Sequence, residues 1–300
     1  MTALTSTTTT STTSTTSATS GPGARRRTAW VPTLVLLLGA LYCLVPIAWV
    51  VIAATKNRAE LFSTFTFAPG TGFLDNISEL TTYRDGIYWR WMLNSAFYAG
   101  LGAFLSAAVS AAGGYALGRF AFRGREAIFK MILAGVLVPG IVLAVPQYLL
   151  LSELGLADSY WSMLLPSILS PYGVYLVRIY AAASVPAELM EAARMDGASE
   201  WRIFSRVAVP MMVPGLITVF LFQFVGIWNN FLLPYVMLAD DEKFPITLGL
   251  YTLLAQGASQ PALYTLVITG CLLAILPLIA LFLVIQRFWS LDLLSGSIKS

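Results

Sequence analysis

The sequence predicts an all-α polytopic membrane protein with six transmembrane helices, and three observations predict it. Of the 300 residues, 57% are hydrophobic and only 11% are charged, whereas soluble domains carry roughly 25% charged residues. Six stretches reach the length of about 20 apolar residues that crosses a bilayer. None of the 15 acidic residues falls in the middle of these stretches. The stretches are 30–54, 93–118, 128–150, 160–182, 210–236 and 262–286.

The chain begins with a Thr/Ser-rich leader, residues 1–28, which has too few apolar residues to form a core. We expect this leader to be disordered and cytoplasmic. Three arginines, Arg25 to Arg27, precede the first apolar run and imitate the start of a signal peptide. The run from Ala29 to Thr55 is much longer than the roughly 7–15 residues of a signal peptide core. The sequence therefore predicts an uncleaved first helix and one six-span membrane domain over 29–300.

The second stretch is rich in small residues and contains Gly114 and Gly118 four residues apart. This spacing lets two membrane helices approach closely, although the pattern does not say which helix is the neighbour. The third stretch contains Gln147 beside Pro146, and the fifth contains Gln223, Asn229 and Asn230. Amides inside a bilayer need hydrogen-bond partners, so these are the notable polar groups of the spans.

The lysines and arginines set the orientation, because cytoplasmic segments of membrane proteins are enriched in them. If the N-terminus is inside, only five of the 18 fall on outer segments, namely Lys56, Arg58, Arg84, Arg90 and Lys243. We therefore expect both termini in the cytoplasm and the largest outer loop at about 55–91. The small excess of basic over acidic residues is explained by this enrichment on the cytoplasmic side and does not indicate a nucleic-acid partner.

Several functions are disfavoured by what the sequence lacks. It contains no histidine, and its two cysteines, Cys43 and Cys271, lie within apolar runs, so we expect no transition-metal site. No lysine follows a glycine as an ATP-binding phosphate loop requires. Without a carboxylate inside a span, a secondary carrier is disfavoured. Without an acid pair or an activated nucleophile, we expect no catalytic residues and no enzyme.

A charged, amphipathic segment separates the fourth and fifth apolar stretches, at about 184–209. Ser184 is a plausible N-cap with Pro186 in the first turn, and Gly197 suits the end of a helix. Ser199 can cap a second short helix that leads to Pro210. The pattern alone fits a helix on lipid headgroups as well as a protein-docking helix.

The spacing within this segment resembles the cytoplasmic loop signature of ATP-binding-cassette importer permeases. Glu191, Ala192 and Ala193 are followed after three residues by Gly197, and after nine more by the stretch Val-Ala-Val-Pro ending at Pro210. Two valines, Val207 and Val209, stand where the family has Ile and Leu. Residues 92–99, 138–168 and 220–238 are similar to the carbohydrate-uptake branch, in particular to the shorter six-span subunit of the maltose transporter. The C-terminal stretch departs from the family's usual ending at Leu291 and Asp292.

The resemblance implies the permease subunit of an ATP-driven importer of a mono- or oligosaccharide in the bacterial cytoplasmic membrane. The partners it implies are a second, homologous permease, two ATP-binding subunits and an extracytoplasmic sugar-binding protein. ATP and Mg would lie on the ATPase, so this chain would bind no cofactor. A permease of the same family for another solute, such as glycerol 3-phosphate, remains an alternative, and a secondary carrier is a weaker one.

The resemblance also implies roles for particular residues. The first short helix of the 188–210 loop would dock on the ATPase, through the set Glu191, Ala192, Ala193, Asp196, Gly197 and Pro210; whether Glu191 pairs locally or across that interface stays open. The polar groups Gln147, Gln223, Trp228, Asn229 and Asn230 either line the translocation path or bond to the partner permease. The outer stretch 253–263 would reach into the binding protein's cleft, with Gly257, Ala258 and Ser259 small enough to enter it.

Overall fold

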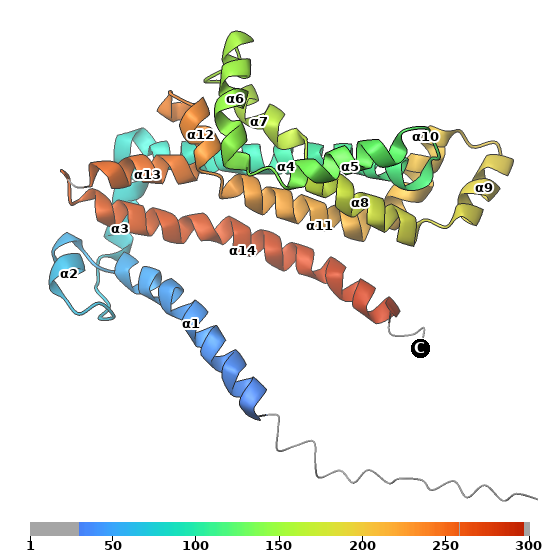
Figure 1. Cartoon of the computed structure of the whole chain (residues 1–300). Coiled ribbons are helices and arrows are strands. Elements are labelled where there is room, and N and C mark those ends of the chain that lie inside the picture. The colour runs from blue at the N-terminus through green and yellow to red at the C-terminus, as the bar shows by residue number, and fades with distance from the viewer. Residues whose placement is uncertain (1–29, 258, 297–300) are drawn as a thin grey trace, which may run out of the picture. The chain divides into compact units, whose positions relative to one another are not determined.

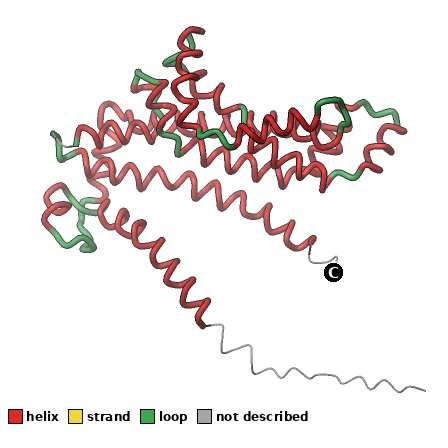
Figure 2. Tube along the Cα trace, viewed as in Figure 1, coloured by secondary structure: helices red, strands yellow, loops and turns green. Residues whose placement is uncertain are grey.

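The computed structural model describes residues 30–257 and 259–296, so the Thr/Ser leader, Ala258 and the last four residues lie outside the described residues. All regular elements in the described ranges are helical (Figure 2). The chain divides into two units, Met1–Ala48 and Trp49–Ser300. Helix α1 (Trp30–Ala54), which coincides with the first predicted span, begins in the first unit and ends in the second.

The second unit contains all of the other elements. The outer segment that follows α1 forms α2 (Arg58–Ser63), α3 (Phe73–Thr82) and a 3-10 turn, η1 (Tyr83–Gly86). The elements that follow are α4 (Ile87–Arg119), α5 (Arg125–Val136), α6 (Gly140–Glu153), α7 (Tyr160–Ile168), α8 (Pro171–Ser184), α9 (Ala187–Met195), α10 (Glu200–Ile203), the π-helical turn η2 (Phe204–Ala208), α11 (Val209–Trp228), α12 (Leu232–Met237), the 3-10 turn η3 (Asp241–Lys243), α13 (Ile246–Gln256) and α14 (Leu263–Gly296).

Helix α4 is the centre of the second unit and packs along both α8 and α11 (Figure 1). The close approach to α8 depends on Gly114, because a Cβ atom there would lie 2.6 Å from the Cβ of Val177 and 2.8 Å from the backbone nitrogen of Arg178. At Gly118 the same test places the backbone oxygen of Arg178 at 3.2 Å. The prediction of a close helix contact at these glycines is confirmed, and the neighbour is α8 of the same chain.

Within the described residues, four helical segments are long and apolar enough to cross a membrane, and up to six spans result when each of two bent pairs counts as one. The four are Trp30–Ala54, Phe73–Arg119, Glu200–Trp228 and Leu263–Phe288. The first pair is α5 with α6, bent by 103°. The second is Tyr160–Ser184 with Ala187–Met195, bent by 75°. The helix that contains the second predicted span begins at Ile87, before residue 93, and follows α3 and η1 without a loop.

Three predicted spans are less regular than the apolar pattern suggested. The third, 128–150, is interrupted between α5 and α6, where Pro139 lacks the N–H that would continue the helix. The fourth, 160–182, is interrupted before Pro171, since the residue preceding a proline is held in an extended conformation. The fifth ends at Trp228 and not at residue 236. There the amides of Asn229 and Asn230 bond to nearby backbone and end one helix before α12 begins.

Two hydrophobic clusters lie at opposite ends of the second unit. One joins the first half of α4 to α13 and the start of α14, around buried Trp91, Leu248 and Leu266. The other joins the second half of α4 to α8, α9 and α10, around Val177 and Ile203. Figure 1 shows α9 and α10 at one end and α12 and α13 toward the other. By the orientation expected from the lysines and arginines, the first cluster lies at the outer end and the second at the cytoplasmic end.

Candidate coupling loop and polar groove

The helix of the predicted coupling loop, α9, ends at a glycine whose conformation explains its place in the motif. Gly197 has φ +77°, a left-handed conformation that residues with a Cβ adopt at a cost. Its N–H donates to the carbonyl of Arg194 at 3.0 Å, and that of Ala198 donates to the carbonyl of Ala193 at 3.0 Å. This pair of bonds is the Schellman arrangement, which satisfies the last carbonyls of a helix. The prediction that Gly197 stops the helix is confirmed.

The caps of the loop agree with the prediction in part. Ser199 caps α10 as predicted, accepting a hydrogen bond from the N–H of Arg202 at 3.4 Å. Ser184 does not cap α9: it is the last residue of α8, and the N-cap of α9 is Pro186, which has no side-chain bond to offer. The helix starts later because Val185 is completely buried in the core below the loop, so the chain must run extended through that position.

The base of the loop is fixed to the membrane helices by buried side chains. Met190 of α9 is 3% exposed and Ile203 of α10 is fully buried. Both belong to the cluster that contains Tyr115 of α4 and Val177 of α8. The ring of Tyr115 lies 5.1 Å from that of Phe204, centroid to centroid. A movement imposed on α9 is therefore transmitted to α4 and α8, because close-packed cores do not absorb displacement.

The side of the loop that faces away from α4 and α8 is exposed to solvent. Glu191, Ala192, Asp196 and Gly197 are exposed, Ala193 is half-buried, and Pro210 is exposed in the first turn of α11. A Cβ atom at Gly197 would have no neighbour within 4 Å. Among the described residues Glu191 takes part in no ion pair. Large apolar side chains stand beside these groups: Met195 is 88% exposed and Trp201 is 73% exposed.

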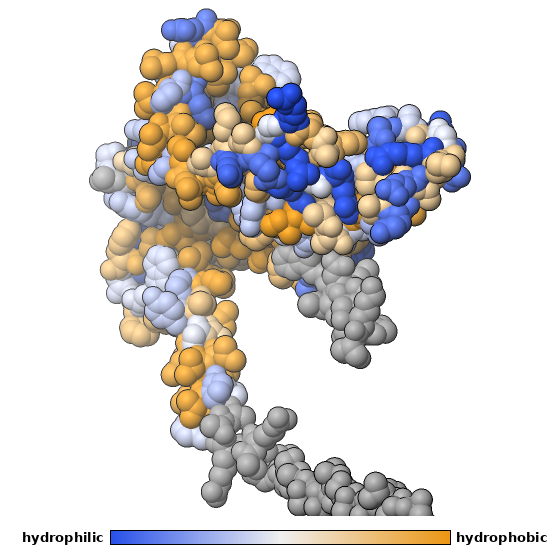
Figure 3. Space-filling view, turned by 45° about the vertical axis from the view of Figure 1, so that its right-hand side comes forward, coloured by the Kyte–Doolittle hydropathy of each residue, from blue (hydrophilic) through white to orange (hydrophobic). Residues whose placement is uncertain are grey.

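The exposed apolar residues of α9 itself, Met195 and Leu189 (43% exposed), lie at a polar end of the molecule, whereas Trp201 lines an apolar groove with side chains of α4 and α11. Hydrophilic side chains gather over the end of the second unit that holds α9 and α10 (Figure 3). One exposed ion pair crosses the turn, with Arg194 Nε 2.7 Å from Glu200 Oε1. A cluster of exposed apolar residues with a polar rim is typical of a protein-binding surface.

The amides of the predicted path separate into two groups. Gln147 of α6, Gln223 of α11 and Asn230 line one groove of about 440 Å³ together with Ser167. Gln223 also bonds between helices, donating from Nε2 to the Oγ of Ser106 on α4 at 3.0 Å. Gln223 therefore lines the groove and finds a partner on another helix of its own chain, and bonding to a partner permease stays a prediction.

The structure does not bring Trp228 and Asn229 to this groove. They line a separate cavity with Tyr251 and Cys271. Trp228 is 3% exposed and stacks on Phe224, with ring centroids 5.6 Å apart. The separation follows from the helical repeat. Gly226, Ile227 and Asn230 come three, four and seven positions after Gln223 and lie on its side, whereas Trp228 and Asn229, five and six positions after it, point elsewhere.

The outer stretch 253–263 is shorter as a loop than expected, because α13 continues to Gln256. Gly257 is buried, and a Cβ atom there would lie 3.0 Å from the Cζ of Tyr264. Ser259 is exposed, and its Oγ donates to the carbonyl of Gln256 at 2.9 Å. Ala258 lies outside the described residues. The part of this stretch that a partner can reach is thus centred on Ser259.

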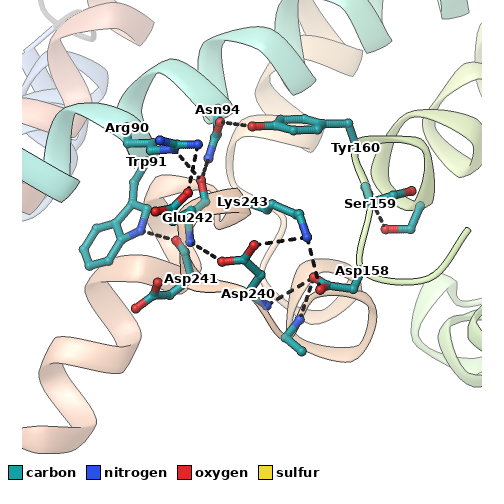
Figure 4. A network of polar contacts seen from close by, with 12 residues as sticks. Arg90, Trp91, Asn94, Asp158, Ser159, Tyr160, Asp240, Asp241, Glu242 and Lys243 are labelled. Atoms are coloured by element: carbon teal, nitrogen blue, oxygen red, sulfur yellow. Dashed lines mark hydrogen bonds and ion pairs between the residues drawn. The ribbon is translucent and has the colours of Figure 1, made fainter.

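A polar network at the opposite end from α9 was not anticipated from the sequence (Figure 4). Asp158, between α6 and α7, accepts the N–H groups of Ala239 and Asp240 at 3.1 Å each. The ammonium group of Lys243 lies 3.1 Å from Asp158 and 3.1 Å from Asp240. Burial acts to raise the pKa of Asp158, but the two N–H groups and Lys243 outweigh it and hold the pKa below its usual value.

The same network attaches the 239–244 segment to α4. Trp91 Nε1 donates to the carbonyl of Asp241 at 2.8 Å, and Asn94 Nδ2 donates to the carbonyl of Glu242 at 2.8 Å. The hydroxyl of Tyr160 donates to Asn94 Oδ1 at 3.2 Å. The only sequence signal was the run of charges at 240–243, which does not reveal its partners 150 residues away. In the described part of the chain, no group of three His, Cys, Asp or Glu residues could hold a metal ion.

Comparison with known proteins agrees with this arrangement. An arabinooligosaccharide transport system permease protein of Halalkalibacterium halodurans is 33% identical over 274 residues, covering 90% of this chain and 96% of the relative. A lactose transport system permease protein of Rhizobium radiobacter is 32% identical over 278 residues, covering 92% and 98%. A bacterial ABC transporter involved in the import of the acidic polysaccharide alginate contains a chain of similar structure, with a TM-score of 0.76 and 25% identity, covering 86% of this chain and 95% of that one.

The family model of the binding-protein-dependent transport system inner membrane component matches residues 110–291, which include the whole coupling loop and the fifth and sixth spans. This match covers more than half of the sequence. The chain therefore belongs to the family of inner membrane components of binding-protein-dependent transport systems and is a transport subunit rather than an enzyme.

Proposed function

We propose that this chain is the permease subunit of an ATP-driven importer that takes up a sugar delivered by an extracytoplasmic binding protein. It forms half of the translocation path, and a second, homologous permease forms the other half. The observation that carries the proposal is the loop of α9 and α10, which has a buried base on α4 and α8 and an exposed surface around Met195. The named solutes of the relatives, arabinooligosaccharides and lactose, support a sugar as the cargo.

The proposed role of the loop is to receive the movement of a separate ATPase. One ATPase of a pair that holds ATP and Mg binds the exposed surface that includes Glu191, Ala192, Asp196 and Gly197. Its closure on ATP displaces α9, and the buried side chains of Met190 and Ile203 carry the displacement to α4 and α8. Ala193 and Pro210 shape the two ends of this loop. In this orientation both chain termini are cytoplasmic.

The proposed path for the sugar follows the groove of Gln147, Gln223 and Asn230. The apolar side chains around it on α5, α6 and α7 are exposed, including Ile141 at 67% and Leu169 at 71%. A second permease that covers this surface would close the groove into a path. At the outer end, the binding protein docks near Ser259 and the 239–244 segment, which the Lys243 network holds in place.

Co-purification tests this proposal directly. The full chain, tagged at its C-terminus and expressed with its native neighbours, should bring down a second permease, an ATPase and a sugar-binding protein in a gentle detergent, as identified by mass spectrometry. Met195→Glu should reduce ATPase recovery at least tenfold while the second permease is retained, because the substitution places a charge in an apolar contact.

The matched control is Leu74→Glu on α3, which also replaces an exposed apolar side chain, 76% exposed, but at the outer end. It should leave ATPase recovery unchanged. Recovery of a lone chain, or equal ATPase recovery with wild type and Met195→Glu, would contradict the proposed coupling.

A further inference from the structure

We propose that the groove between α6, α7 and α11 accepts an uncharged, polyhydroxylated solute, so that this chain's half of the path discriminates against acidic, phosphorylated and cationic cargo. Gln147 is the residue we assign as its principal free hydrogen-bonding group. This inference rests on the proposed function and narrows its substrate class. It is not given by the fold, since the structural relative named above imports an acidic polysaccharide.

The composition of the groove is the first argument. Its polar side chains are Gln147, Ser167, Gln223 and Asn230, and the remaining lining residues are apolar or glycine. No lining residue is ionisable. Its volume of about 440 Å³ lies in the range of roughly 300–1,000 Å³ typical of small-molecule sites. A charged solute in such a lining would lose its hydration without meeting an opposite charge, which is costly in a medium of low polarity.

The hydrogen bonds already made inside the chain show which atoms remain for a ligand. Gln223 Nε2 donates to Ser106, and Asn230 Oδ1 accepts the N–H of Leu233 at 3.2 Å. Ser167 donates to the carbonyl of Met163 at 2.7 Å. The atoms left are Gln223 Oε1, Asn230 Nδ2 and the whole amide of Gln147, which makes no hydrogen bond within the described residues.

The remaining atoms are a mixture of donors and acceptors, and a sugar hydroxyl both donates and accepts. A carboxylate or phosphate only accepts, so it would meet the NH2 group of Gln147 but leave the Oε1 of Gln223, whose Nε2 is held by Ser106, facing a negative charge. An ammonium group only donates and would leave Asn230 Nδ2 without an acceptor. Polar groups left unpaired in this way are what reject an ill-matched substrate most strongly.

The start of α6 adds donors to the same lining, because Gly140 is its first residue. The free N–H groups of a helix start can bond a hydroxyl oxygen, and the helix dipole contributes about half a positive charge. Half a charge does not balance the full charges of an acidic oligosaccharide or a phosphate diester. The start of α6 therefore complements the amides for a neutral polyol and does not change the selectivity.

The test uses cells that carry the complete transporter, with this chain present or deleted, and a defined mixture of solutes measured by mass spectrometry. The neutral probes are arabinotriose, lactose and diacetylchitobiose, and the charged probes are trigalacturonate and glycerol 3-phosphate. We expect uptake that depends on this chain for neutral probes alone. Gln147→Leu should lower that uptake roughly fivefold to tenfold, the effect of losing one hydrogen-bonding partner, and Gln147→Asn should restore part of it.

Gln286→Leu is the matched control, since Gln286 is an exposed amide on α14 that does not line the groove; it should leave uptake unchanged. Chain-dependent uptake of either charged probe, or equal uptake by wild type and Gln147→Leu, would overturn the inference. So would the absence of uptake of all probes. In each case, recovery of the ATPase in the co-purification decides separately whether the proposed function stands.

Discussion

Replacing Gly197 by aspartate should disturb the proposed docking of the 188–210 loop on the ATPase much more than the folding of the loop. The backbone at this position has φ +77°, so a side chain costs about 1 kcal/mol in conformational strain. No atom lies within 4 Å of the added Cβ, so the chain itself presents no steric obstacle. A cost of about 1 kcal/mol is small against the roughly 5–15 kcal/mol that stabilises a folded domain. The variant should therefore fold and reach the membrane in near-normal amounts.

The docked state should be affected much more. A carboxylate buried against the ATPase without a partner costs at least about 2 kcal/mol, which corresponds to a loss of roughly 30-fold or more in affinity. We expect ATP-dependent uptake to be abolished and ATPase co-purification to fall, while the second permease is still recovered. Uptake by cells and recovery of each subunit measure the two effects on the same preparations.

Gly124 provides a control with the same local strain. It has φ +86°, is exposed, and also has no atom within 4 Å of an added Cβ, but it lies at the start of α5, outside the 188–210 loop. Gly124→Asp should leave uptake within about twofold of wild type, because only the backbone cost of about 1 kcal/mol applies. Normal uptake in Gly197→Asp, or equal losses in both variants, would refute the reasoning that the exposed surface of α9 is a docking surface.

Two further predictions concern stability. Gly114→Leu should lower the melting temperature of the purified complex, with a cost of about 1–3 kcal/mol, because its Cβ would lie 2.6 Å from Val177. Gly100→Leu on the same helix should leave the melting temperature unchanged, because an added Cβ there has no atom within 4 Å. Equal melting temperatures of the two variants would contradict the α4–α8 contact. The pKa of Asp158 is lowered in the folded protein, so its stabilisation is present above the ordinary value of 3.8 and is lost as the pH falls through the lower, folded value. Melting temperature followed from about pH 6 to about pH 3 should therefore fall less steeply in Lys243→Met than in wild type, and identical slopes would show that the ion pair makes no contribution.

The regular, local features of this protein were predictable from its sequence. The apolar runs, the end of α9 at Gly197 and the cap at Ser199 all depend on residues near in sequence, because helices are built from bonds between neighbours. The motif spacing from Glu191 to Pro210 identified the family for the same reason. The small residues at Gly114 and Gly118 predicted a close approach, but the neighbouring helix, α8, was identified only by the tertiary structure. Hydropathy alone could not locate the interruptions at Pro139 and Pro171, since a broken span is as apolar as a continuous one.

The groove and the outer network depended on contacts between residues far apart in the chain. Gln147 lines one groove with Gln223 and Asn230 only because α6 packs against α7 and α12, and Trp228 and Asn229, adjacent in sequence to the groove, turn away from it. Asp158 and Lys243 lie 85 positions apart, and neither the charge of one nor its spacing identifies the other. The sequence by itself determined the apolar helices, the turn and cap of the 188–210 loop, and the family. The tertiary structure decided which polar groups share a surface, because packing, and not proximity along the chain, brings side chains of different helices together.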